Sequence, residues 1–112
     1  MPYIKPDDGR REALRKGEPA LSAGELNYQI FYYVKHTVNR QLKDIKKFVD
    51  QFLGNKPNYQ RYNDMTGALI RCQKECNRRG LQTLIIEKVM NSYDEEIAKY
   101  EDIKIDSNGD VE

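Results

Sequence analysis

Cysteine, histidine and tryptophan are scarce in this chain: its 112 residues include two Cys, one His and no Trp. Cys72 and Cys76 are four positions apart, so on a helix their α-carbons would lie about 5.4 Å apart with parallel side chains. An intrachain disulfide is therefore not expected, and both residues are predicted to be free thiols that pack as small hydrophobes. A metal site would need His36 together with both cysteines, and core packing is the preferred interpretation. No cofactor is predicted.

The chain also lacks a long apolar run and an excess of either charge. No segment approaches the ~20 apolar residues of a membrane-spanning helix, and the N-terminus has no apolar stretch typical of a signal peptide. A cytoplasmic protein that does not contact membranes is expected. The 19 Lys and Arg nearly balance the 18 Asp and Glu. Nucleic acid is therefore not an expected partner, and anions would be attracted only by local patches.

Charged residues are abundant instead, at 33% against 38% hydrophobic residues. This composition is polar for a compact monomer but typical of long solvated helices, so an extended or oligomeric architecture is favoured. A length of 112 residues fits a single domain that covers 1–112.

Residues 1–21 are interpreted as an N-terminal arm. Three prolines and two glycines in this segment exclude a long regular element and leave room for one short helical turn around residues 10–16.

Residues 22–54 show the pattern of one long helix. Ser22 and Glu25 have the spacing of a capping box, and no Gly or Pro occurs between Gly24 and Gly54. Apolar residues recur at steps of mostly three and four, which predicts an uninterrupted amphipathic helix that ends at Gly54. The apolar positions are Leu26, Ile30, Phe31, Val34, Val38, Leu42, Ile45, Val49 and Phe52.

Residues 58–101 show a second helical pattern, which Asn58 or Asn63 could cap. Its apolar seam has coiled-coil spacing and resumes in phase beyond Gly80. Gly80 is either a C-cap that divides the segment into a helix pair or an interior glycine that costs about 1 kcal/mol relative to Ala. Because the apolar repeat keeps the same register on both sides of Gly80, one continuous or kinked helix is favoured.

Residues 102–112 alternate apolar and polar residues around Asn108 and Gly109, a dipeptide that favours a type I′ turn. A short β-hairpin is predicted here. The predicted fold is therefore all-α, with two long amphipathic helices and a short C-terminal β-hairpin, assembled as an oligomeric helical bundle.

The order of short motifs resembles a family of small uncharacterised proteins of bacteria, archaea and phages. These proteins begin MPYI and close near an Asn-Gly-Asp-Val string. The resemblance implies a helical protein with a short C-terminal β element, and it implies no activity. The motifs that carry it are Met1–Ile4, Gly24–Tyr28, Asn63–Asp64, Gly67–Leu69, Glu75 with Arg78–Arg79, Tyr100–Asp102, Lys104–Ile105 and Asn108–Val111.

Acidic residues could serve an enzyme that releases pyrophosphate from nucleoside triphosphates. Small helical enzymes of that class hold Mg²⁺ with acidic pairs three residues apart on one helix face. Here Glu25, Asp64 and Glu75 have no acidic partner at that spacing, and the cluster at residues 94–96 with Glu101 is interpreted as a solvated face. No catalytic or metal-binding residue is predicted.

Arginines near the end of the second helical segment form the leading candidate site. Arg71, Arg78 and Arg79 are spaced to present guanidinium groups on one helix face, a geometry that suits phosphate. Glu75 is a partner for these arginines, and Tyr62 offers a stacking surface for a base. The ligand-binding residues are predicted to be Arg71, Arg78, Arg79, Glu75 and Tyr62.

The predicted function is that of a small oligomeric helical binding protein. It would capture an anionic ligand such as a nucleotide, or a protein partner, at a subunit interface. A phage origin would suit interference with a host system. Two alternatives stay open: a metal-dependent nucleoside triphosphate pyrophosphohydrolase and a structural adaptor.

Overall fold

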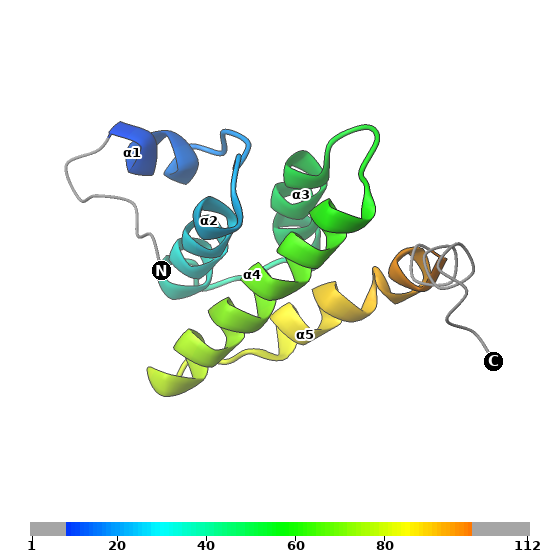
Figure 1. Cartoon of the computed structure of the whole chain (residues 1–112). Coiled ribbons are helices and arrows are strands. Elements are labelled where there is room, and N and C mark those ends of the chain that lie inside the picture. Colours follow the sequence, from blue (N-terminus) through cyan, green and yellow to red (C-terminus); the bar gives the residue numbers. More distant parts are fainter. Residues whose placement is uncertain (1–8, 100–112) are drawn as a thin grey trace.

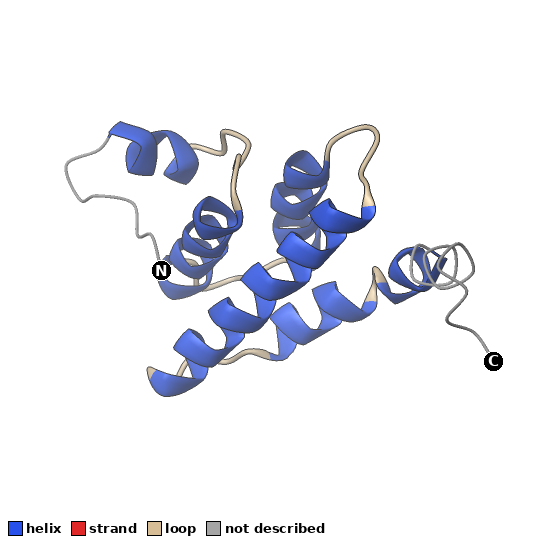
Figure 2. Cartoon of the chain, in the orientation of Figure 1, coloured by secondary structure: helices blue, strands red, loops and turns tan. Residues whose placement is uncertain are grey.

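The computed structural model describes residues 9–99, and this part of the chain contains helices and no strands. Residues 94–99 form a further helical segment. Figures 1 and 2 show the arrangement. The helices are α1 (Gly9–Arg15), α2 (Ala23–His36), α3 (Leu42–Leu53), α4 (Tyr59–Arg78) and α5 (Leu84–Asn91).

The helices pack in a simple succession. Each helix from α1 to α4 contacts the next one, and α2 and α3 also contact α4 and α5 respectively. The most extensive contact joins α2 to α4, and α5 runs back alongside α4 (Figure 1). One core lies between these helices, and its largest fully buried side chains include Phe52, Leu14, Leu26, Ile30, Ile45, Met65 and Leu69.

The prediction of two long helices is wrong, and the first break lies between α2 and α3. Arg40 Nε donates to the carbonyl of Val34 at 2.8 Å, while the Tyr33 hydroxyl accepts from the Gln41 amide at 2.7 Å. These side chains satisfy backbone groups that a continuous helix would pair internally. The turn needs no glycine, because no residue here has positive φ. Val38, placed on the apolar seam by its spacing, is 99% exposed at this turn.

The second predicted helix is divided at Gly80, so the preference for a continuous helix is also wrong. Gly80 has φ +74°, a left-handed conformation that glycine adopts without strain. Its amide donates to Asn77 and the Leu81 amide donates to Cys76, at 3.0 and 2.8 Å. This pair of bonds is the Schellman motif, which ends α4 and allows α5 to fold back.

Several local predictions are confirmed. Ser22 caps α2 by accepting from the Glu25 amide at 3.2 Å, and Asn58 caps α4 by accepting from the Arg61 amide at 2.8 Å. Gly54 follows the last residue of α3 with φ +78°. The Glu25 carboxylate, however, accepts from the Leu21 amide and not from Ser22, so the capping box is only half formed.

The apolar seams are buried within a single chain. Their residues in α2, α3 and α4 face one another across the core, because the break at residues 37–41 folds the first seam back on itself. Exposed seams therefore no longer argue for an oligomer, and self-association stays an untested prediction. The predicted hairpin at residues 102–112 lies outside the described residues, as do residues 1–8 of the N-terminal arm.

Candidate ligand-binding groove

A pocket of about 310 Å³ lies where α1, α2 and α4 meet. We call it the arginine groove, because three of its side chains are arginines from two helices. It is lined by Arg11, Asn27, Tyr28, Phe31, Arg71, Glu75 and Arg79.

The short helix α1 is fixed against α2 by polar and apolar contacts. Arg10 donates two hydrogen bonds to the Glu25 carboxylate, at 2.9 and 2.8 Å, and this guanidinium lowers the pKa of Glu25. Leu14 is fully buried, and the Gln29 amide donates to its carbonyl at 2.9 Å. These contacts place the neighbouring Arg11 and Arg15 above α2.

Aromatic rings on α2 form the floor beneath these arginines. The Arg11 guanidinium lies 5.0 Å from the centre of the Tyr28 ring, within cation–π range. Arg15 lies 4.9 Å from the Tyr32 ring and donates to the Tyr28 hydroxyl at 2.7 Å. Tyr28 and Tyr32 are four residues apart, with ring centres separated by 6.2 Å. Arginines of α1 are thus ordered on a tyrosine surface of α2.

The opposite wall comes from α4, where Arg71, Glu75 and Arg79 repeat every four residues. Glu75 accepts hydrogen bonds from Arg78 and from Arg79, the latter at 3.0 Å. These two arginines lower the pKa of Glu75 to about 2, so its carboxylate remains charged near neutral pH. The Arg79 guanidinium also lies 5.4 Å from the Phe31 ring.

The groove holds more positive than negative charge. Among residues 9–99, three guanidinium groups line it with a single carboxylate, and that carboxylate is shared with Arg78. Within residues 9–99, Arg71 makes no hydrogen bond or ion pair, and the buried Nε of Arg11 has no acceptor. The arrangement therefore has unused donors beside aromatic rings.

The structure brings together three of the five residues predicted to bind a ligand, namely Arg71, Glu75 and Arg79. Arg78 binds Glu75 but does not line the groove. Tyr62 lies near the start of α4, is buried, and lines a separate hollow with Leu53 and Tyr93. Arg79 is 46% exposed in the single chain and is not a buried cation.

Sequence reasoning missed Arg11, Asn27, Tyr28 and Phe31. Arg11 was assigned to an arm without a site, and Phe31 was assigned only to the apolar seam. Two signals could have revealed the groove: Arg11 and Arg15, and Tyr28 and Tyr32, are each four residues apart and so share a helix face.

Other constellations do not assemble. His36 is exposed and stacks on Tyr32 at 4.3 Å, whereas Cys72 and Cys76 are free thiols buried in the core. Residues 94–96 are exposed. Within the described part of the chain, no group of three or more His, Cys, Asp or Glu is placed to hold a metal ion. No helix between residues 9 and 99 is long and apolar enough to cross a membrane.

Comparison with protein families provides one match, over residues 1–111, to a family described as a domain of unknown function, DUF6899. The chain belongs to this family. The match covers the arginine groove and every described helix. Membership confirms the resemblance to an uncharacterised family and assigns no activity. No curated protein and no solved structure matches the chain.

Proposed function

We propose that this chain is a binding protein that captures a phosphorylated ligand, in concrete terms a nucleotide, in the arginine groove. The observation that carries the proposal is the excess of guanidinium groups over carboxylates in a pocket with aromatic walls. Guanidinium forks bind phosphate oxygens in pairs. Arg71 is exposed and makes no hydrogen bond or ion pair within residues 9–99, so its donors are available for that purpose.

The aromatic side chains support a nucleotide over a free phosphate. Tyr28 and Phe31 line the same pocket as the arginines, and a base can stack on such rings. A volume of about 310 Å³ lies at the lower end of the range for small-ligand sites. The phosphates would lie between Arg11 and Arg71, and the base would lie toward the rings.

Glu75 gives the groove an internal competitor. Its carboxylate accepts a hydrogen bond from Arg79, at an Nε to Oε1 distance of 3.0 Å. A phosphate dianion carries more charge than this carboxylate and can displace it from Arg79. Weakly charged anions would displace Glu75 poorly, so this arrangement favours phosphorylated ligands over simple carboxylates.

Calorimetry with a panel of ligands tests the proposal. The panel contains AMP, ADP, ATP, adenosine, inorganic phosphate, pyrophosphate and an oligoglutamate peptide. We expect the nucleotides to bind most tightly, because only they engage both the guanidinium groups and the rings. Adenosine and phosphate should each bind at least about tenfold more weakly, since each lacks one set of contacts.

Matched variants locate the site. Arg71→Ala should weaken nucleotide binding by about 10- to 100-fold, the range for loss of charge-assisted hydrogen bonds. Lys74→Ala removes an exposed cation of the same helix that does not line the groove, and it should leave affinity unchanged. Tyr28→Leu should weaken binding, whereas Tyr28→Phe should preserve stacking.

Three results would contradict the proposal: no nucleotide binding at millimolar concentration, equal loss in the Arg71 and Lys74 variants, or preferential binding of the acidic peptide. The last result would favour a protein partner. Release of pyrophosphate from ATP in the presence of Mg²⁺ would favour the enzyme alternative. No observation in residues 9–99 supports that alternative at present.

A further inference from the structure

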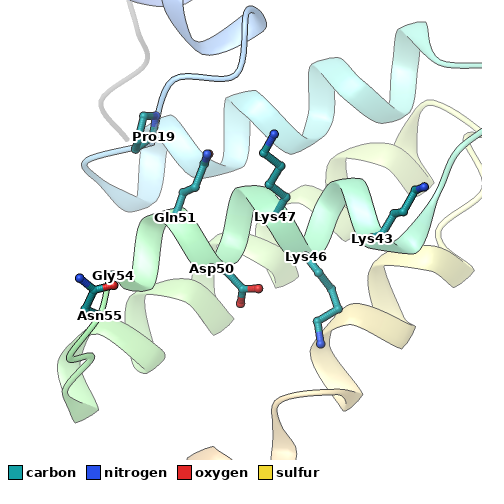
Figure 3. A pocket seen from close by; sticks show the side chains of 8 residues that line it. All are labelled: Pro19, Lys43, Lys46, Lys47, Asp50, Gln51, Gly54 and Asn55. Carbon is teal, nitrogen blue, oxygen red and sulfur yellow. The ribbon is translucent and has the colours of Figure 1, made fainter.

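A second cationic surface lies on α3, on residues that the arginine groove does not use. It is a shallow hollow of about 670 Å³, shown in Figure 3, and we call it the lysine hollow. In Figure 3, Lys47 and Gln51 point to one side of α3, while Lys46 and Asp50 point to the other. The hollow is lined by Pro19, Lys43, Lys46, Lys47, Asp50, Gln51, Gly54 and Asn55.

In the described part of the chain, the lysines of this hollow form no ion pair. Lys43 and Lys47 make no ion pair or hydrogen bond with any residue from 9 to 99. The one carboxylate, that of Asp50, accepts a hydrogen bond from the Tyr93 hydroxyl, and Lys46 lies 5.1 Å from the same ring. Gln51 Oε1 is buried and has no donor within the described residues. Lys43 and Lys47 are therefore available to bind carboxylates.

Charge is divided unevenly along the chain. Residues 9–99 carry 17 Lys and Arg against 11 Asp and Glu, whereas residues 100–112 carry five acidic side chains and one lysine. The near-neutral total therefore conceals a cationic body joined to an anionic segment. The acidic residues of that segment are Glu101, Asp102, Asp106, Asp110 and Glu112.

The chain leaves the described body beside the lysine hollow. Tyr93 contacts Asp50 and Lys46, and Glu96 in the following helical segment lines a smaller hollow of about 320 Å³ together with the same two residues. The described residues end at Lys99, three positions later. Thirteen further residues can extend about 43 Å, which is ample to cover a surface next to their starting point.

We propose that the acidic segment of residues 100–112 docks on the lysine hollow of its own chain. The segment supplies carboxylates for Lys43 and Lys47, which have none as partners within residues 9–99. Lysines of this kind act as hydrated point charges, so the contact is reversible and weakens as salt screens it. The docked segment would cover α3 and leave the arginine groove open. This inference does not rest on the proposed nucleotide site.

Paramagnetic relaxation in the full-length protein tests the docking. A nitroxide attached through Ser107→Cys reports on the segment, because the native cysteines are both buried. We expect the strongest signal broadening at the amides of Lys43 to Asn55 and weaker broadening at Tyr28 and Phe31, which lie on the neighbouring helix α2. Raising salt should reduce the broadening.

Charge reversal supplies the matched controls. Lys43→Glu combined with Lys47→Glu should abolish the broadening on α3, and adding Asp102→Lys with Asp106→Lys should restore part of it. Lys35→Glu combined with Lys88→Glu makes the same charge change on exposed lysines outside the hollow and should leave the broadening in place. Circular dichroism confirms that each variant is folded.

Four outcomes would overturn the proposal. The first is no broadening on α3, and the second is broadening that is strongest at the arginine groove. The third is broadening that the Lys43 and Lys47 reversals do not change. The fourth is broadening that arises only from the spin label of another molecule. The last outcome is measured by mixing isotope-labelled protein with spin-labelled, unlabelled protein. It would assign the segment to a second copy of the chain.

Discussion

The arginine groove and the lysine hollow are both cationic, but they are built in different ways. The groove combines side chains of α1, α2 and α4, and it sets guanidinium groups against aromatic rings and a carboxylate. Except for Pro19, the hollow uses α3 and the two residues after it. A surface on one helix survives wherever that helix forms, whereas a pocket between three helices exists only when all three are packed. The groove should therefore be the more selective surface and also the more easily destroyed.

The largest effect is expected from a change that detaches α1, because the arginine groove needs α1 and the lysine hollow does not. Leu14→Ala removes a fully buried side chain, so we expect it to lower the free energy of unfolding by about 2–5 kcal/mol. Nucleotide binding should weaken as well, because Arg11 leaves the groove. Urea denaturation and calorimetry measure the two effects. Leu21→Ala, at a residue 67% exposed, should change stability by less than about 0.5 kcal/mol. Equal effects of the two changes would show that α1 does not pack as described.

A smaller effect should follow from removing the polar anchor of α1. Arg10→Met breaks a partly buried, two-bond contact with Glu25, and we expect a loss of about 1–2 kcal/mol at neutral pH. Lys16→Met removes the exposed ion pair with Glu12 and should cost at most about 0.5 kcal/mol. Thermal unfolding of both variants provides the comparison.

The Arg10 contact should also respond to acid. Folding lowers the pKa of Glu25, so its contribution is present above the ordinary carboxyl pKa of 4.5 and is lost as pH falls through the lowered value. The stability difference between wild type and Arg10→Met should therefore shrink below pH 4.5. A difference that stays constant down to pH 3 would contradict this assignment.

Removing the charge of Glu75, which competes with the ligand for Arg79, should have a moderate effect. This effect is on nucleotide binding and not on stability. Glu75→Gln frees Arg79 from a full negative charge, and we expect nucleotide affinity to rise roughly tenfold. The pKa of Glu75 is about 2, so the wild-type carboxylate competes throughout the range from pH 5 to 8. The gain should accordingly be the same at pH 7 and pH 8, where the ligand phosphate also keeps its charge. Glu87→Gln, at an exposed position of α5, is the control. Unchanged or weaker binding by the Glu75 variant would refute internal competition.

The smallest effect is expected at the lysine hollow. Lys47→Ala removes an exposed cation without an ionic partner in the described residues, so stability should change by less than about 0.5 kcal/mol at any salt concentration. Chemical denaturation at low and high salt measures this. A loss above 1 kcal/mol would show that the hollow contributes to the folded core, which would remove the contrast with the groove.

The residues that cap or end the helices could be predicted from the sequence. The break that divides the first predicted helix could not. Ser22, Asn58 and Gly54 act at their predicted places because each satisfies or permits backbone geometry by itself. The turn at residues 37–41 depends on Tyr33 and Arg40. Both residue types are common inside helices, so neither one signals a turn. Apolar spacing fits either one long helix or two helices folded together, since both bury the same side chains.

The candidate site shows the same division. Arg71, Glu75 and Arg79 were found because they lie on one helix at a spacing that can be counted. Arg11 and Tyr28 join them only through the packing of α1 on α2, which depends on Arg10, Leu14 and Gln29. Tyr62 was placed at the site for its ring alone, and its position on the buried face of α4 moves it to another part of the molecule.

The succession of helix contacts has a consequence for how the chain acquires its structure. The principal contacts join each helix to the next one or to the one after it. Most of them therefore connect residues that are close in the sequence. Chains with such short-range topology fold in about microseconds to milliseconds, far faster than sheet proteins of similar length. A pairing such as α2 with α4 becomes available once α4 has left the ribosome, before α5 has emerged. Assembly in the order of synthesis is therefore the natural route to the native state, and the arginine groove would be complete before the acidic segment emerges.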